Sequence, residues 1–214
     1  MSKSDKKEKP ILFNSEMVRA ILDGRKTQTR RILKRQPVGN GFICSNGSHW
    51  GIKEPTFISK NSPYQVGDLL WVRESYWYRE EDKMVCYDDA SCRFLNWSKD
   101  KIFTKAGEKL ESPSEMKQYG FKRMPSIFMP KALSRIWLEI TAVRVERVQD
   151  ISEVDAKAEG VVLSVDTLFP TINAATKQRQ QFPILWNSIN AKRGFSWESN
   201  PFVWVIEFKK AGKK

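Results

Sequence analysis

The run Phe202-Val203-Trp204-Val205-Ile206-Glu207-Phe208 constrains the fold more than any other segment of the chain. Apolar residues occupy both parities of this run, whereas a strand with one solvent-exposed face alternates between apolar and polar residues. The run therefore predicts a strand that is covered on both faces, at the centre of a sheet. A chain of 214 residues is long enough to build the core that such a strand needs within one large domain.

The other regular elements follow from periodicity and from turn residues. The patterns predict an amphipathic helix over 14–23 and strands over 27–33, 69–74 and 135–148. A bulge near Thr141 and Ala142 would reconcile the two apolar parities of the longest strand. Few strands, short helices and no alternation of strand and helix predict an α+β fold, a small β barrel with peripheral short helices.

Two further helices are expected in the C-terminal half. Ser152 opens a capping box, so a short helix should begin there and end before Gly160, with Glu159 in its last turn. A second helix is expected from Phe182, with Pro183 tolerated in its first turn.

Irregular composition marks the parts outside this core. The ranges 35–63 and 78–125 are predicted to be insertions in a single domain spanning 10–210. The second of these contains two short strand candidates, at 84–87 and 101–104. The range 1–9 is predicted to be a basic, disordered tail, and 211–214 a basic tail. The sequence contains no apolar stretch near the roughly 20 residues of a membrane helix and no signal peptide, so a cytoplasmic location without membrane contact is expected.

Cysteine and histidine are too few for several common kinds of site. Three cysteines cannot all pair, and reduced thiols are the simplest interpretation. The candidate zinc ligands are Cys44, His49, Cys86 and Cys92. Their spacing is loose and contains no Cys-x-x-Cys pair, so no metal and no cofactor is predicted.

The net charge of +12 is concentrated in a few places. The tails supply half of it, and a run over 25–35 carries six cations and no carboxylate: Arg25, Lys26, Arg30, Arg31, Lys34 and Arg35. A compact basic run favours nucleic acid or phosphate as a partner. The alternative is a solvated basic face that keeps the protein soluble.

Three motifs carry a resemblance to a known family. The segments Gly24-Arg25-Lys26-Thr27-Gln28-Thr29-Arg30, Gly67-Asp68-Leu69-Leu70-Trp71-Val72 and Val203-Trp204-Val205-Ile206-Glu207-Phe208 resemble the ASCH domain. That family is similar in fold to the PUA domain, a small β barrel associated with RNA and modified nucleotides. The head 10–13 and the stretch 125–130 look like a larger branch that is common in prophages.

The resemblance also implies a candidate catalytic set. One compact bacterial branch is implied to remove the acetyl group from N4-acetylcytidine, and the positions that match its Lys, Thr and Glu are Lys26, Thr29 and Glu159. A neutral Lys26 could take the proton of Thr29 as the hydroxyl attacks the amide, and Glu159 could position the substrate. The alternatives are a phosphate contact for Lys26, an ordinary strand position for Thr29 and an ion pair with the basic run for Glu159.

The sequence therefore supports two functions. The first is binding of RNA or a modified nucleotide, with DNA also compatible, in a basic cleft lined by Thr29 and by Arg25, Lys26, Arg30, Arg31 and Arg73. The second is an amidohydrolase acting on N4-acylated cytidine. A ribonuclease is a minor alternative, because the sequence contains no evident cluster of metal-binding carboxylates.

Aromatic residues near the irregular segments are candidates for base stacking: Trp50, Tyr64, Tyr76, Trp77 and Tyr78. Arg73 and Glu74 are expected at the rim of the same barrel, with a buried ion pair as the competing interpretation.

Overall fold

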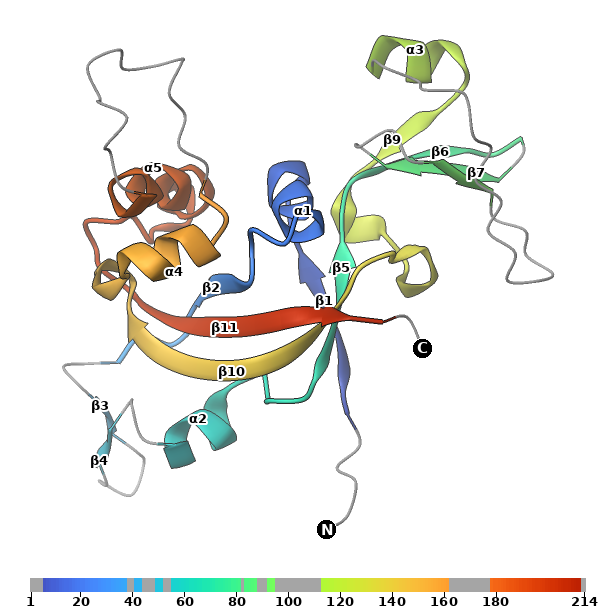
Figure 1. Ribbon diagram of the computed structural model, residues 1–214. Coiled ribbons are helices and arrows are strands. Elements are labelled where there is room, and N and C mark those ends of the chain that lie inside the picture. The colour runs from blue at the N-terminus through green and yellow to red at the C-terminus, as the bar shows by residue number, and fades with distance from the viewer. Residues whose placement is uncertain are drawn as a thin grey trace. The chain divides into compact units, whose positions relative to one another are not determined.

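The computed structural model describes residues 6–37, 41–43, 49–51, 55–81, 83–87, 92–94, 113–161 and 178–212 (Figure 1). The chain divides into two compact units, each assembled from segments that are distant in sequence. Unit 1 comprises Met1–Lys7, Ala20–Leu69 and Leu138–Lys210, and unit 2 comprises Glu8–Arg19, Leu70–Trp137 and Ala211–Lys214.

The sheet of unit 1 is organised around the C-terminal strand. Strand β11 (Phe202–Ala211) lies between the long strand β10 (Trp137–Arg147) and the short strand β2 (Gln28–Ile32). β11 and β2 are antiparallel, with Ile206 opposite Thr29 and Val205 opposite Arg30. Every residue from Phe202 to Ile206 is buried, so the prediction of a strand covered on both faces is confirmed.

Short helices and a hairpin complete unit 1. These are β3 (Gly41–Ile43), β4 (His49–Gly51), α2 (Pro55–Asn61), η3 (Val148–Asp150), α4 (Glu153–Ala158), α5 (Gln178–Asn190) and η4 (Ala191–Arg193). Helices α4 and α5 lie side by side in Figure 1. Their apolar residues pack with β11 in one buried cluster, formed by Val148, Ile151, Ala156, Phe182, Trp186, Val203 and Val205.

Helix α5 starts earlier than the sequence predicts. It already includes Gln178, so Pro183 lies inside the helix rather than in its first turn. The reason is tertiary: the Glu153 carboxylate of α4 accepts hydrogen bonds from the backbone N–H groups of Gln178 (2.6 Å) and Arg179 (3.2 Å). Two N–H groups without partners inside the helix are thereby satisfied, and the helix extends beyond the proline.

Unit 2 contains an ordered sheet that lies largely within the predicted insertion 78–125, and the short strand expected at 84–87 is confirmed. Strand β1 (Glu8–Leu12) neighbours β5 (Leu69–Arg73), and a second sheet has the order β8 (Cys92–Phe94), β7 (Met84–Tyr87), β6 (Tyr76–Arg79) and β9 (Lys122–Met124). Its other elements are the first turns of α1 (Ser15–Leu22), α3 (Pro113–Gln118), η1 (Ser126–Phe128) and η2 (Lys131–Leu133). Two buried clusters hold this unit together, one around Tyr87 and Met129 and the other around Trp77 and Phe121.

Two sequence expectations need correction, and a third concerns residues outside the described part of the chain. The α+β class is confirmed, but the described strands form open sheets and no closed barrel. Strand β2 lies at the edge of its sheet. The residue Lys26, which precedes β2, forms a bridge with Glu159 and not with a further strand. Cys86 is buried and disulfide-bonded, not a reduced thiol. The strand expected at 101–104 falls outside the described residues.

None of the helices in the described part of the chain is long and apolar enough to cross a membrane.

Candidate functional site

The turn after α1 places Lys26 against the end of α4. Gly24 has a φ of 74°, a backbone conformation that glycine adopts without strain. The N–H groups of Arg25 and Lys26 then donate to the carbonyl of Ala20, at 2.8 and 2.9 Å, which fixes the tight turn. Lys26 forms an isolated antiparallel bridge with Glu159, and the N–H of Thr27 donates to the carbonyl of Ala158 at 2.9 Å.

The end of helix α4 places Glu159 next to Lys26. The predicted capping box is confirmed: the Ser152 side chain accepts from the N–H of Asp155, and the Asp155 carboxylate accepts from the N–H of Ser152. Glu159 follows the helix as its C-cap. Gly160 then turns the chain with a φ of 77°, and a Cβ at this position would lie 3.0 Å from the Cβ atoms of Ala20 and Lys26. A larger residue would therefore be strained by its backbone conformation and would push the two segments apart.

Lys26 and Glu159 form a buried ion pair. Lys26 Nζ donates to Glu159 Oε2 at 2.8 Å and to the Glu159 carbonyl at 2.8 Å, and the exposed fractions of the two side chains are 0% and 5%. Burial lowers the pKa of Lys26, and the charge and hydrogen bond of Glu159 oppose this shift without cancelling it. The positive charges of Arg31 and Arg30 lower the pKa of Lys26 further. A lysine with a lowered pKa is a better general base near neutral pH.

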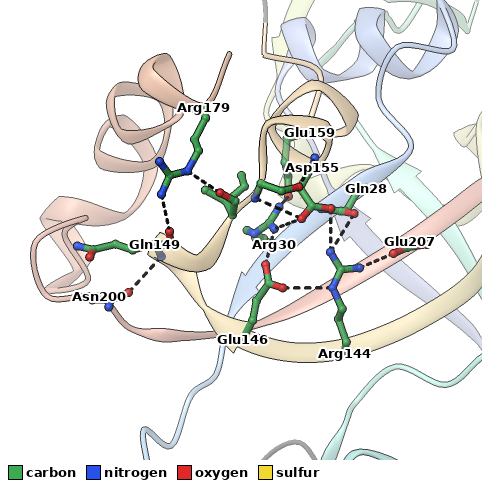
Figure 2. Close-up of polar contacts among 12 residues, drawn as sticks. Gln28, Arg30, Arg144, Glu146, Gln149, Asp155, Glu159, Arg179, Asn200 and Glu207 are labelled. Carbon is green, nitrogen blue, oxygen red and sulfur yellow. Dashed lines mark hydrogen bonds and ion pairs between the residues drawn. The ribbon is translucent and has the colours of Figure 1, made fainter. Parts of the chain in front are cut away.

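A network of charged residues continues from this pair (Figure 2). Arg30 Nη1 donates to Glu159 Oε1 at 3.1 Å, and Arg30 Nη2 contacts Glu146 and lies 3.4 Å from Asp155 Oδ2. Arg144 contacts both Glu146 Oε2, at 3.2 Å, and Asp155 Oδ1, at 2.9 Å. Arg144 also contacts Glu207, and its Nη2 donates to Gln28 Oε1 at 3.4 Å. The network thus joins β2, β10, β11 and α4.

The network shows that part of the basic run over 25–35 is paired with carboxylates. Three cations, Lys26, Arg30 and Arg144, meet four carboxylates, those of Glu146, Asp155, Glu159 and Glu207. The buried part of the run is therefore neutralised within unit 1 and is not presented to solvent. The interpretation of Glu159 as an ion-pair partner of the basic run agrees with these contacts.

The predicted nucleic-acid-binding residues differ in exposure. Arg25 is exposed and pairs with Asp23 at 2.8 Å, whereas the side chains of Lys26 and Arg30 are 0% and 1% exposed. Arg31 is half-buried, and burial lowers the pKa of its guanidinium. Arg73 belongs to unit 2, where its guanidinium carbon lies 5.4 Å from the centre of the Trp71 ring.

Thr29 lies in β2, three residues after Lys26, and is buried. Because side chains alternate along a strand, Thr29 points to the face opposite that of Gln28 and Arg30. Of the three predicted catalytic residues, the structure brings Lys26 and Glu159 into direct contact, and Thr29 lies outside the charged network.

The predicted stacking residues are mostly covered. Tyr76 and Trp77 are each 5% exposed, Tyr64 and Tyr78 are half-buried, and the side chain of Trp50 lies outside the described residues. These positions offer little open ring surface to a base.

Glu74 forms a buried ion pair, as the competing interpretation of this segment has it. Its partner is Arg135, which it contacts at two points, at distances of 2.8 and 2.7 Å. Arg135 also lies over the ring of Tyr87, 4.1 Å from its centre. The ion pair therefore belongs to the core of unit 2.

No group of three or more His, Cys, Asp or Glu residues that could hold a metal ion occurs among the described side chains. The candidate zinc residues Cys44, His49 and Cys92 have no described side chains, and Cys86 is disulfide-bonded.

Sequence reasoning missed the carboxylates and the arginine that complete the network. Arg144 and Glu146 are two residues apart in a strand that is otherwise largely apolar. This spacing places both side chains on one face, and it is the signal that could have identified them. Asp155 is evident in the sequence only as a capping residue, and its contacts with Arg30 and Arg144 depend on the tertiary structure.

No protein-family model matches the sequence, and no curated protein matches it. Among solved structures, the chain is similar to an ASCH domain from Lactobacillus crispatus, with 12% sequence identity over 95% of this chain and 79% of the other, and a TM-score of 0.38. It is also similar to a protein of the family-model DUF984 from Enterococcus faecalis, with 9% identity over 99% of this chain and 79% of the other, and a TM-score of 0.40.

Proposed function

We propose that this chain is an amidohydrolase that removes an acyl group from the N4 amine of a cytidine, with Lys26, Thr29 and Glu159 as its catalytic residues. The observation that carries the proposal is the buried hydrogen bond between Lys26 Nζ and Glu159 Oε2, together with the lowered pKa of Lys26. A buried lysine of lowered pKa with a specific carboxylate partner is typical of functional sites. The resemblance of the motifs to the ASCH domain supplies the substrate class.

The proposed reaction has two steps. The first step requires substrate binding to bring the Thr29 hydroxyl, which lies outside the charged network, next to Lys26 Nζ. Thr29 Oγ1 then attacks the carbonyl carbon of the amide, neutral Lys26 takes the hydroxyl proton, and the protonated lysine passes it to the N4 nitrogen as the C–N bond breaks. Water then attacks the threonine ester, giving the carboxylic acid and restoring the hydroxyl. Glu159 holds Lys26 Nζ in place and stabilises its ammonium form between the two proton transfers.

The test is incubation of the purified protein with N4-acetylcytidine, with cytidine and acetate measured by chromatography. We expect turnover by the wild type and a loss of about a hundredfold or more in kcat/KM for Thr29→Val and Lys26→Met, because each change removes a reacting group. Thr27→Val is the matched control, since Thr27 is exposed and lies in the same segment.

The control should retain activity within about twofold of the wild type, because surface substitutions away from a site have small effects. Absence of cytidine with the wild-type protein would contradict the proposal, as would equal rates for the wild type and Lys26→Met.

A second candidate is RNA binding, supported by the cations of the basic run that remain exposed. Arg25, Lys34 and Arg35 are exposed, although Lys26 and Arg30 beside them are buried. Phosphate contacts by exposed cations make affinity fall steeply with salt concentration. The contacts would therefore come from the ends of the run rather than from its middle.

Fluorescence anisotropy with a labelled single-stranded RNA tests this candidate. Replacing Lys34 and Arg35 by Gln should weaken binding and reduce the slope of log affinity against log salt by about one for every phosphate that is no longer neutralised. The matched control is Lys60→Gln, another exposed cation of unit 1. An affinity that does not change between low and moderate salt would rule the candidate out.

A further inference from the structure

The guanidinium of Arg30 occupies the centre of the charged network. Its side chain is 1% exposed, and its donors reach three carboxylates that come from two different elements and the turn after α4. Glu146 belongs to β10, Asp155 to α4, and Glu159 follows α4 as its C-cap. The ring of Phe182 in α5 covers the group, with its centre 5.7 Å from the guanidinium carbon.

The two oxygens of Glu159 are divided between two cations. Oε1 accepts from Arg30 Nη1 at 3.1 Å, and Oε2 accepts from Lys26 Nζ at 2.8 Å. The terminal torsion of a glutamate is broad, so a carboxylate held by one partner can rotate. A planar guanidinium whose other donors are anchored at Glu146 and Asp155 restricts that rotation, because its donors have fixed directions.

We propose that Arg30 is a positioning residue, which holds the Glu159 carboxylate so that Oε2 remains on Lys26 Nζ. Arg30 itself touches no reacting atom. The inference rests on the proposed function only for its kinetic consequence, because the geometry on which it depends lies within the protein.

The charged groups around Lys26 determine whether loss of the Arg30 contact raises or lowers the pKa of Lys26. Glu159 acts on Lys26 from the turn after α4, and Arg31 and Arg30 act from β2. The hydrogen bond and charge of Glu159 raise the pKa of Lys26, against the larger effect of burial. Release of Glu159 therefore lowers the pKa of Lys26 further, provided that the charge of Arg30 is retained.

Two variants retain that charge. Arg30→Lys keeps the cation and removes the planar fork. Glu146→Gln leaves Arg30 in place and removes one of the carboxylates that anchor the Arg30 guanidinium. The side chain of Glu146 is 14% exposed. Lys209→Gln is the control, because Lys209 is a 65% exposed lysine of the same unit that pairs with Glu139.

The first readout is the titration of Lys26, followed by NMR in protein labelled with ¹³C-lysine and assigned with Lys26→Arg. We expect the midpoint to fall by about half a pH unit or more in both variants and to stay unchanged in Lys209→Gln. If Arg30 had only a structural role, Arg30→Lys would lower the midpoint of urea unfolding and leave the Lys26 midpoint where it is in the wild type. That result would overturn the inference, and Glu146→Gln provides the same test if Arg30→Lys does not fold.

The second readout is the pH dependence of N4-acetylcytidine hydrolysis. We expect kcat to fall about tenfold in both variants with little change in KM, because the base is misoriented while the substrate contacts remain. The acid limb of the profile should move to lower pH together with the Lys26 midpoint. If the wild type does not hydrolyse the substrate, the proposed function fails, whereas the NMR midpoints still decide whether Arg30 holds Glu159.

Discussion

At the scale of single residues, Gly160 shows how one position determines the approach of two segments. Its φ of 77° is unfavourable for other residues, and a Cβ at this position would lie 3.0 Å from the Cβ atoms of Ala20 and Lys26, so that these neighbours would have to shift. Gly194 has a similar φ of 82°, but no atom lies within 4 Å of the position that its Cβ would occupy. A comparison of substitutions at the two glycines therefore distinguishes the cost of backbone strain alone from the cost of strain combined with steric contact.

We expect Gly160→Ala to lower the free energy of unfolding by about 2–4 kcal/mol, because backbone strain and the contact with Lys26 act together. Gly194→Ala should cost only about 1–2 kcal/mol, since strain alone applies there. Urea denaturation followed by tryptophan fluorescence measures both values. Equal costs for the two substitutions would contradict the contact at Gly160.

At the scale of elements, the short helix α4 depends on its first turn and on the network. Asp155 serves both, as it caps the helix and contacts Arg144 and Arg30. Burial raises the pKa of Asp155, but the Ser152 hydrogen bond and the charges of Arg144 and Arg30 outweigh it, so the pKa lies below its ordinary value of 3.8. A helix of six residues has little intrinsic stability, so these contacts hold it in place.

The lowered pKa of Asp155 predicts a particular dependence of stability on pH. Its stabilisation is fully present above pH 3.8 and is lost as the pH falls through the lower value of the folded state, because the unfolded chain takes up the proton first. Asp155→Asn should lower the free energy of unfolding by about 1–2 kcal/mol at neutral pH and make its decline in acid shallower. Urea titrations between pH 2 and 7 test this, with the exposed Asp150→Asn as control.

If the free energy of unfolding falls equally steeply in acid for Asp155→Asn and for the wild type, this account is contradicted. The predicted capping box is confirmed, but the strength of the cap could not be foreseen, since Arg144 and Arg30 reach Asp155 only after β10, β2 and α4 have packed.

At the scale of the whole molecule, each unit has its own buried clusters. In unit 2 the ion pair between Glu74 and Arg135 is buried, with exposed fractions of 4% and 7%, and Arg135 also covers Tyr87. The pair between Lys131 and Glu8 in the same unit is exposed. Removal of one partner of a buried pair leaves an uncompensated charge, whereas exposed pairs contribute little.

We therefore expect Arg135→Ala to destabilise unit 2 by about 3–5 kcal/mol. Lys131→Ala should cost at most about 1 kcal/mol. Hydrogen exchange followed by mass spectrometry should show faster exchange in β6 and β7 for Arg135→Ala and a smaller change in β2 and β11, because those strands pack in the cluster of unit 1. Uniform acceleration across both units would contradict this assignment of the core.

The sequence by itself determined the local elements. The apolar parities predict the central strand at 202–208, and the capping box predicts the helix that carries Glu159, because periodicity and caps depend on neighbours in the chain. Only the tertiary structure decided the environment of the basic run. Lys26 and Arg30 are exposed cations or buried ion-pair partners according to whether carboxylates from β10 and α4 reach them, and these lie more than a hundred residues away in sequence. No local pattern encodes such pairing, since it arises when distant segments exclude water from the same space.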